Sequence, residues 1–304
     1  MNFKENKTLI SIIAVIFSIV LVGGGYLFVK KACVEDIKEK YREDIEALKE
    51  IADFEKIDCN PFSRSVEITN IKAKDGSFVI RRVEFSKFKE DKELKVPLSL
   101  RMRAEGVKTK DENGLTEGDI DILYNLDLEK KQMNLDIDIS EKNEGIYNIN
   151  ILLGNIDRDT IKILNEVAKK NKLKGNENLN ENLDFIMALG NISIERLHFE
   201  FENRGVLDKI LEEDAKNRNM SVDELKEEMI ADINKSLKEK NLSEDTRKFF
   251  IAFRDLIEGK RKKISFTIVK KGNTDTSLMK ILSLIMISPD PLKEFNNMFK
   301  IEIN

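Results

Sequence analysis

The sequence has no tryptophan, one histidine, two cysteines and four prolines among its 304 residues. A lone histidine, His198, is a poor basis for a metal site or a catalytic triad without a cluster of Cys, Asp or Ser at fixed spacing. We therefore interpret His198 as an ordinary strand residue. The HExxH, GxSxG, P-loop and GxGxxG motifs are absent as well. These absences predict a protein that is not an enzyme and that has no cofactor and no metal.

The sequence also has no marked excess of positive or of negative charge. Lys and Arg number 52 and Asp and Glu number 56, which gives a formal net charge of -4. Nucleic-acid binding usually requires a clustered basic face. The balance therefore argues against a nucleic-acid partner.

One segment, residues 9–29, has no charged residue at all: LISIIAVIFSIVLVGGGYLFV. As a helix it would be about 31 Å long, close to the thickness of the hydrocarbon core of a bilayer. It is too long for the apolar stretch of a cleavable signal peptide, and no A-x-A cleavage site closes it. We therefore expect an uncleaved transmembrane helix that anchors the protein in the inner (cytoplasmic) membrane.

The orientation of this anchor depends on its flanks. Lysines flank it on both sides, so the positive-inside rule hardly discriminates between the two possible orientations. The short N-terminal tail and the long following domain favour a cytoplasmic tail over residues 1–8. We then expect residues 33–304 to be periplasmic or otherwise extracytoplasmic.

Residues 33–57 are predicted to form a juxtamembrane helix, because apolar residues recur there at three- and four-residue spacing. The helix could pack on its own domain, which we favour, or pair with a partner helix. Cys33 and Cys59 are the only thiols, and export would permit a disulfide between them. An unbroken helix to about Glu50 would require an almost straight return of the chain to close it. Both the disulfide and two separate thiols stay open.

Residues 60–304 are predicted to form an α+β domain with a curved, mainly antiparallel sheet. Its clearest part is a meander of three strands within 119–154, where apolar and polar residues alternate. The expected first pairing sets Leu126 opposite Leu135 and Tyr124 opposite Ile137, around a loop at 129–132. The expected second pairing sets Ile149 opposite Ile137 and Ile151 opposite Leu135. The aspartates between these positions are interpreted as a solvated face.

Helical patterns interrupt the predicted strands. A charged helical insertion is expected at about 206–258, where Ser221 and Glu224 have the spacing of a capping box. A short, almost wholly apolar helix is expected over 277–288, stopped by Pro289 and Pro291. The final residues, FKIEIN, are predicted to form the last strand.

The order of these elements is similar to that of AsmA-like envelope proteins and of single-anchor periplasmic proteins of the YdgA type. An N-terminal anchor leads into a short helix, and FSRSVEITNIKAKDGSFVIRRVEFSKF follows as paired strands. The segment ISIERLHFEFENRGVLDKILEEDAKNRNMSVDELKEEMIADI also resembles a strand-then-helix segment of uncharacterised proteins in that neighbourhood. The resemblance implies a curved sheet whose apolar inner face holds lipid acyl chains.

Two hypotheses about function follow. The first is a membrane-anchored scaffold or interaction protein of the bacterial cell envelope that binds an envelope protein through its helical insertion. The alternative is AsmA-like binding of a phospholipid or another apolar ligand in a groove of the sheet. The residues expected to line that groove are Tyr124, Leu126, Leu135, Ile137, Ile149 and Ile151.

Overall fold

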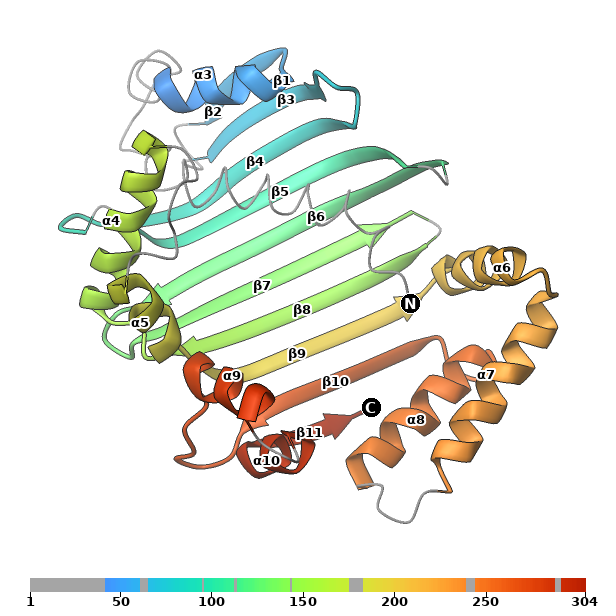
Figure 1. The fold of residues 1–304 in the computed structure, drawn as a ribbon. Helices are drawn as coiled ribbons and strands as arrows, with labels where there is room; N and C mark the ends of the chain where they lie inside the picture. The colour runs from blue at the N-terminus through green and yellow to red at the C-terminus, as the bar shows by residue number, and fades with distance from the viewer. Residues whose placement is uncertain are drawn as a thin grey trace.

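The computed structural model describes residues 42–60, 65–94, 96–111, 114–142, 144–174, 183–238, 244–287 and 291–304. These residues form a mixed fold with one large open sheet, antiparallel in its pairings, and several helices (Figure 1). The transmembrane helix predicted at 9–29 and the cytoplasmic tail at 1–8 lie outside the described residues. Within them, no helix has both the length and the apolar character needed to span a bilayer.

The sheet has 11 strands, and from β3 onward they lie side by side in the order in which they occur in the chain. β1 and β2 both pair with the outer side of β3. The strands are β1 (Ala52–Asp53), β2 (Lys56–Asn60), β3 (Ser65–Ala73), β4 (Phe78–Asp91), β5 (Val96–Asp111), β6 (Gly114–Asp127), β7 (Gln132–Glu141), β8 (Gly145–Gly154), β9 (Ser193–Asn203), β10 (Lys263–Lys270) and β11 (Phe299–Ile303).

The helices lie at the margins of this sheet (Figure 1). One end of the strands holds α4, α5, α9 and α10, and the other end holds the insertion α6–α8, because these segments join neighbouring strands at opposite ends. The helices are α3 (Arg42–Ile51), α4 (Arg158–Lys174), α5 (Leu183–Asn191), α6 (Val206–Arg218), α7 (Val222–Ser236), α8 (Glu244–Ile257), α9 (Leu278–Ile287) and α10 (Pro291–Met298).

The meander is present, and its second pairing is confirmed: Ile149 faces Ile137 and Ile151 faces Leu135. The first pairing is shifted by two residues from the predicted one, so that Tyr124 faces Leu135. The cause is the turn after Asp127. Its carboxylate accepts hydrogen bonds from the backbone N–H groups of Glu129 at 3.1 Å and Lys130 at 3.0 Å, which starts the turn at Asp127. A two-residue shift keeps every side chain on its predicted face.

The prediction of one helix over 33–57 agrees with the structure at 42–51 and is wrong at 52–57, while 33–41 lies outside the described residues. Helix α3 ends at Ile51, and the chain then forms the edge strands β1 and β2. The helix was extended too far because a short edge strand has too few residues for its alternation to stand out. Another helix, α10, was not predicted. It begins at Pro291, which suits the first position of a helix because proline has no N–H to leave unpaired there.

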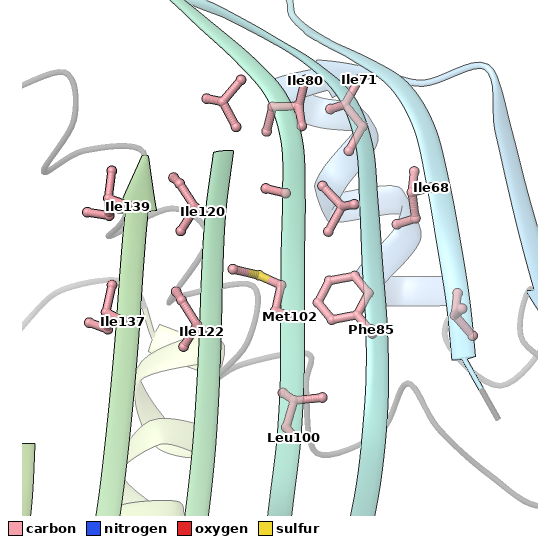
Figure 2. Close-up of a cluster of buried hydrophobic side chains, with 14 of the residues drawn as sticks. Ile68, Ile71, Ile80, Phe85, Leu100, Met102, Ile120, Ile122, Ile137 and Ile139 are labelled. Atoms are coloured by element: carbon pink, nitrogen blue, oxygen red, sulfur yellow. The ribbon is translucent and has the colours of Figure 1, made fainter. Parts of the chain in front are cut away.

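The main core lies on one face of strands β3–β7, where isoleucine, valine and leucine side chains from neighbouring strands meet in rows. Figure 2 shows Phe85, Leu100, Met102, Ile120 and Ile122 in this layer. Ile45 and Leu48 of α3 pack against the same core. The apolar face predicted from the alternation is therefore mostly interior.

Candidate functional site

The six residues predicted to line a groove come from β6, β7 and β8, and the observed register places them on one face of the sheet. Three of them are buried: Leu126, Leu135 and Ile137 are 5%, 6% and 7% exposed. Tyr124, Ile149 and Ile151 are half-buried. Whether these residues contact a ligand stays a prediction. The more accessible part of the apolar face lies farther along the sheet, toward β10.

The same face continues over β8, β9 and β10 as three cross-strand rows of apolar side chains. Most members are half-buried, and we call this surface the open strip. Two pairs of rings stack within it: Phe199 and Phe266 have centroids 5.2 Å apart, and those of Tyr147 and Phe201 are 5.1 Å apart. The rows are Tyr147–Phe201–Ile264, Ile149–Phe199–Phe266 and Ile151–Leu197–Ile268.

Helices border the open strip at both ends of its strands. At one end, Ala252 and Leu256 of α8 pack with Ile264, and Phe253 and Phe201 join this cluster. At the other end, side chains of α4, α5 and α9 pack over the ends of β6, β7 and β8. They are Ile161, Leu189 and Leu278. The open strip is therefore an apolar floor between two helical rims.

Sequence reasoning missed the aromatic residues of the open strip. Leu197, Phe199 and Phe201 alternate along β9, and this alternation was the available signal. It begins only after an irregularity in the pairing of β8 with β9, where Leu152 faces Arg196 but Leu153 faces Ile194. A bulge of this kind changes the phase of the strand, so the pattern did not run on from the meander.

The tyrosines of this face carry no charge at neutral pH. Burial raises the pKa of Tyr124 well above its ordinary value of 10.0. Burial also raises the pKa of Tyr147, and the carboxylates of Glu141 and Glu144 raise it further. A deprotonated ring is disfavoured in such surroundings. Both phenol groups therefore stay neutral on this face.

The opposite face of the sheet is polar and contains a hollow of about 340 Å³. His198 is half-buried there, with its Nδ1 at 2.8 Å from Thr267 Oγ1. Asn148 donates to Asp138 at 2.6 Å, so the polar side chains largely satisfy one another. The polar residues that line it are Lys87, Arg101, Asp121, Asp136, Asp138, Asn148, Asn150 and His198. The hollow is therefore a solvated surface on which polar side chains of neighbouring strands form hydrogen bonds with one another.

Acid is expected to weaken the fold through Asp121 on this polar face. Burial raises the pKa of Asp121, but hydrogen bonds from Arg101 Nε at 2.9 Å and Arg103 Nε at 3.0 Å outweigh it and hold the pKa below its ordinary 3.8. A lowered folded-state pKa means that the stabilisation is complete above the ordinary value and is lost as the pH falls through the folded value.

Urea unfolding from about pH 6 down to about pH 3 measures this effect, because stability follows the difference in protons bound. Asp121→Asn is expected to show a shallower loss of stability with acid than the wild-type chain. Glu129→Gln, at an exposed turn position, serves as the control and should keep the wild-type slope. A wild-type slope in Asp121→Asn would contradict the assignment.

The helical insertion predicted at 206–258 is present as α6, α7 and α8, and we call it the arm. The predicted capping box starts α7: Ser221 Oγ accepts from Glu224 N at 3.2 Å, and Glu224 Oε2 accepts from Ser221 N at 2.7 Å. Leu211, Ala215 and Leu225 form a small core inside the arm. Ile210, Phe249 and Ile251 are exposed on it. The arm thus has its own packing and an apolar surface that the sheet does not cover.

The thiol prediction and the metal prediction concern other parts of the chain. Cys59 lies half-buried on β2, and Cys33 lies outside the described residues, so the predicted disulfide is not tested. In the part of the chain that the structure describes, no three side chains of the His, Cys, Asp or Glu type come together as metal ligands would.

A family model matches part of the chain. A search of curated proteins finds no relative. Residues 138–302 match the model of a protein family described as uncharacterized. This region runs from β7 to β11 and includes both the open strip and the arm. Because the match covers more than half of the sequence, the chain belongs to this family of uncharacterized proteins.

Proposed function

We propose that the protein is a non-enzymatic scaffold or interaction protein, anchored in the inner membrane by residues 9–29, with its main domain outside the cytoplasm. Its arm is the docking element for a partner protein of the cell envelope. The observation that carries the proposal is that the arm combines an internal core with exposed apolar residues. A connection between two neighbouring strands needs only a few residues. A preformed helical arm in that place supports a binding role.

The arm also has the composition of a protein-binding surface. Phe249 stacks against Phe253 with centroids 6.1 Å apart, and Phe253 packs toward Phe201 at the edge of the open strip. Phe249, one turn before Phe253, and Ile251 are exposed on α8. A charged pair, Lys248 with Glu244, lies on the same helix beside these residues. Apolar anchors within a charged rim are typical of protein interfaces.

Site-specific photo-crosslinking in cells tests this proposal. A photoreactive residue at Ile210 or Phe249 of the full-length protein is expected to give one defined crosslinked species. The same residue at Glu129, which is exposed in the turn between β6 and β7 at the opposite end of the strands from the arm, is expected to give none. Equal crosslinking at all three positions, or none at the arm, would rule out the arm as the docking element.

The open strip supports a second candidate function, the binding of a phospholipid or another apolar ligand. The observation that favours ligand binding is that the stacked pairs Phe199–Phe266 and Tyr147–Phe201 are only half-buried. Apolar area that stays accessible in a folded domain costs about 25 cal/mol per Å² relative to burial. An acyl chain lying along these rows would remove that cost.

Native mass spectrometry of the full-length protein, extracted in a mild detergent, tests ligand binding. A co-purifying lipid at fixed stoichiometry is expected, and its loss is expected in Phe199→Asp. Ser140→Asp places the same charge at an exposed position of the opposite face and should retain the lipid. Circular dichroism confirms that both variants are folded. A wild-type protein that carries no lipid would exclude the ligand-binding function, and the scaffold function would be the one that remains.

A further inference from the structure

One edge of the sheet ends in a strand whose outer side is open. Strand β11 is the last in the strand order, and in the described part of the chain only β10 pairs with it. It lies at the margin of the sheet, with α10 leading into one end and α8 near the other (Figure 1). An open edge offers a row of backbone N–H and C=O groups to another strand. The residues of β11 therefore decide which strand can pair there.

The hydrogen bonds at the end of the β10–β11 pairing identify the backbone groups that point outward. Ser265 N donates to Asn304 O at 2.9 Å, and Asn304 N donates to Ser265 O at 3.0 Å. Hydrogen-bonded and non-hydrogen-bonded pairs alternate along an antiparallel ladder. The residues at even positions of β11 therefore bond to β10. Ile301 and Ile303 direct their N–H and C=O groups to the open side.

The apolar face of β11 carries the open strip to the edge of the sheet. Ile301 lies opposite Ile268 of β10, and Ile303 lies opposite Phe266, so both isoleucines extend rows of the open strip. Both are half-buried. A strand added beyond β11 would continue these rows only if it had apolar side chains at the facing positions.

The polar face of β11 carries one charge of each sign. Lys300 Nζ lies 2.7 Å from Glu302 Oε1, and the two side chains are 64% and 48% exposed. The residues opposite them on β10 are Val269 and Thr267, which have no charge. The carboxylate of Asp245, at the start of α8, is the other charge that acts on Lys300. Lys300 and Glu302 are therefore accessible to charges on a strand beyond the open edge.

The sequence of β11, FKIEI, is complementary to itself when two copies run antiparallel. A two-fold axis at Ile301 sets this residue opposite its own counterpart and sets Phe299 opposite Ile303 of the second copy. The same axis sets Lys300 opposite Glu302 of the second copy twice, in the closer, non-hydrogen-bonded pairs of the ladder. An axis at Lys300 or at Glu302 would instead set like charges opposite each other. Charge complementarity therefore selects one partner and one register.

We propose that β11 pairs with β11 of a second copy of this chain, antiparallel and centred on Ile301. The two sheets then form one continuous sheet, and the open strips of both copies meet across the two-fold axis. A strand of 5 residues buries little area, whereas stable interfaces bury about 1,200–2,000 Å², so the dimer should dissociate on dilution. The inference depends on neither the proposed arm nor the proposed anchor.

Charge exchange at β11 tests the proposal on the full-length protein in a mild detergent. Lys300→Glu leaves only acids in the pairing and Glu302→Lys leaves only bases, so each variant should lose the homodimer. An equal mixture of the two variants restores two opposite-charge pairs in every heterodimer. Lys130→Glu makes the same change at an exposed position in the turn between β6 and β7 and serves as the control. Size exclusion with light scattering measures the mass over a dilution series, and circular dichroism confirms the fold.

The wild-type protein and the control are expected to dimerise with the same affinity. Each single variant of β11 should weaken the dimer about tenfold, because two attractive pairs become repulsive, and the mixture should recover the wild-type affinity. A wild-type protein that stays monomeric at every concentration would overturn the proposal. A dimer that both single variants retain would overturn it as well, because the copies would then meet elsewhere. Failure of the mixture to dimerise would refute the register centred on Ile301.

Discussion

Phe85→Ala is expected to lower the free energy of unfolding by about 3–5 kcal/mol, as truncation of a buried aromatic residue typically does. Phe85 is 2% exposed and stands between Val66 of β3 and Met102 of β5 in the central layer of Figure 2. The substitution removes a ring from a row of interlocked side chains. A rigid sheet closes the resulting cavity poorly, and this adds to the lost transfer energy.

Equilibrium unfolding in urea, followed by circular dichroism, measures this loss. Val79→Ala on the same strand changes a residue that is 37% exposed and should cost less than about 1 kcal/mol. Comparable losses in the two variants would mean that the layer around Phe85 is not the main core. A change in the slope of the transition would indicate an altered unfolded or native state rather than a simple cavity.

Leu225→Asp is expected to unfold α6 and α7 without unfolding the sheet. Leu225 is 0% exposed and packs with Leu211 and Ala215 in the core of the arm. An unpaired carboxylate at this position costs several kcal/mol, which exceeds what so small a core can supply. Helix α8 should stay folded, because Ala252 and Leu256 pack against Ile264 of the sheet.

Hydrogen exchange resolves this prediction along the chain. Protection is expected to fall to near zero over residues 206–236 and to persist in β9 and β10. Ile210→Asp changes an exposed position of the same arm. It should leave the protection unchanged, but it should abolish crosslinking of the arm to the proposed partner protein. Loss of protection in β9 as well would show that the arm and the sheet unfold as one unit.

Alternation in the sequence predicts which side of a strand is apolar, but it does not predict what covers that side. Ile137 and Ile149 have the same pattern and face each other across β7 and β8, yet only Ile137 is fully buried. Ile137 belongs to the buried core of β3–β7, whereas Ile149 packs against the edge of that core. Where the core ends depends on contacts between strands far apart in the sequence, so the more accessible part of the face could not be located from local pattern alone.

Register was predictable only where turn chemistry agreed with the pattern. The pairing of β7 with β8 followed from alternation, whereas the pairing of β6 with β7 depended on the hydrogen bonds that Asp127 accepts at its turn. Several registers two residues apart satisfy the same alternation, and the local turn chooses among them. The capping box at Ser221 was predictable because both of its partners lie within one turn of helix.

From β3 onward the strands occupy the sheet in the order in which they are synthesised. A nascent chain can therefore grow this sheet vectorially, since each emerging strand finds its partner already in place. The growing edge of the intermediate is always the newest strand, and its unpaired backbone groups are open to aggregation. That exposure lasts longest at β9, because the whole of α6–α8 must be made before β10 arrives. A pause in translation within this insertion would prolong the most vulnerable stage of assembly.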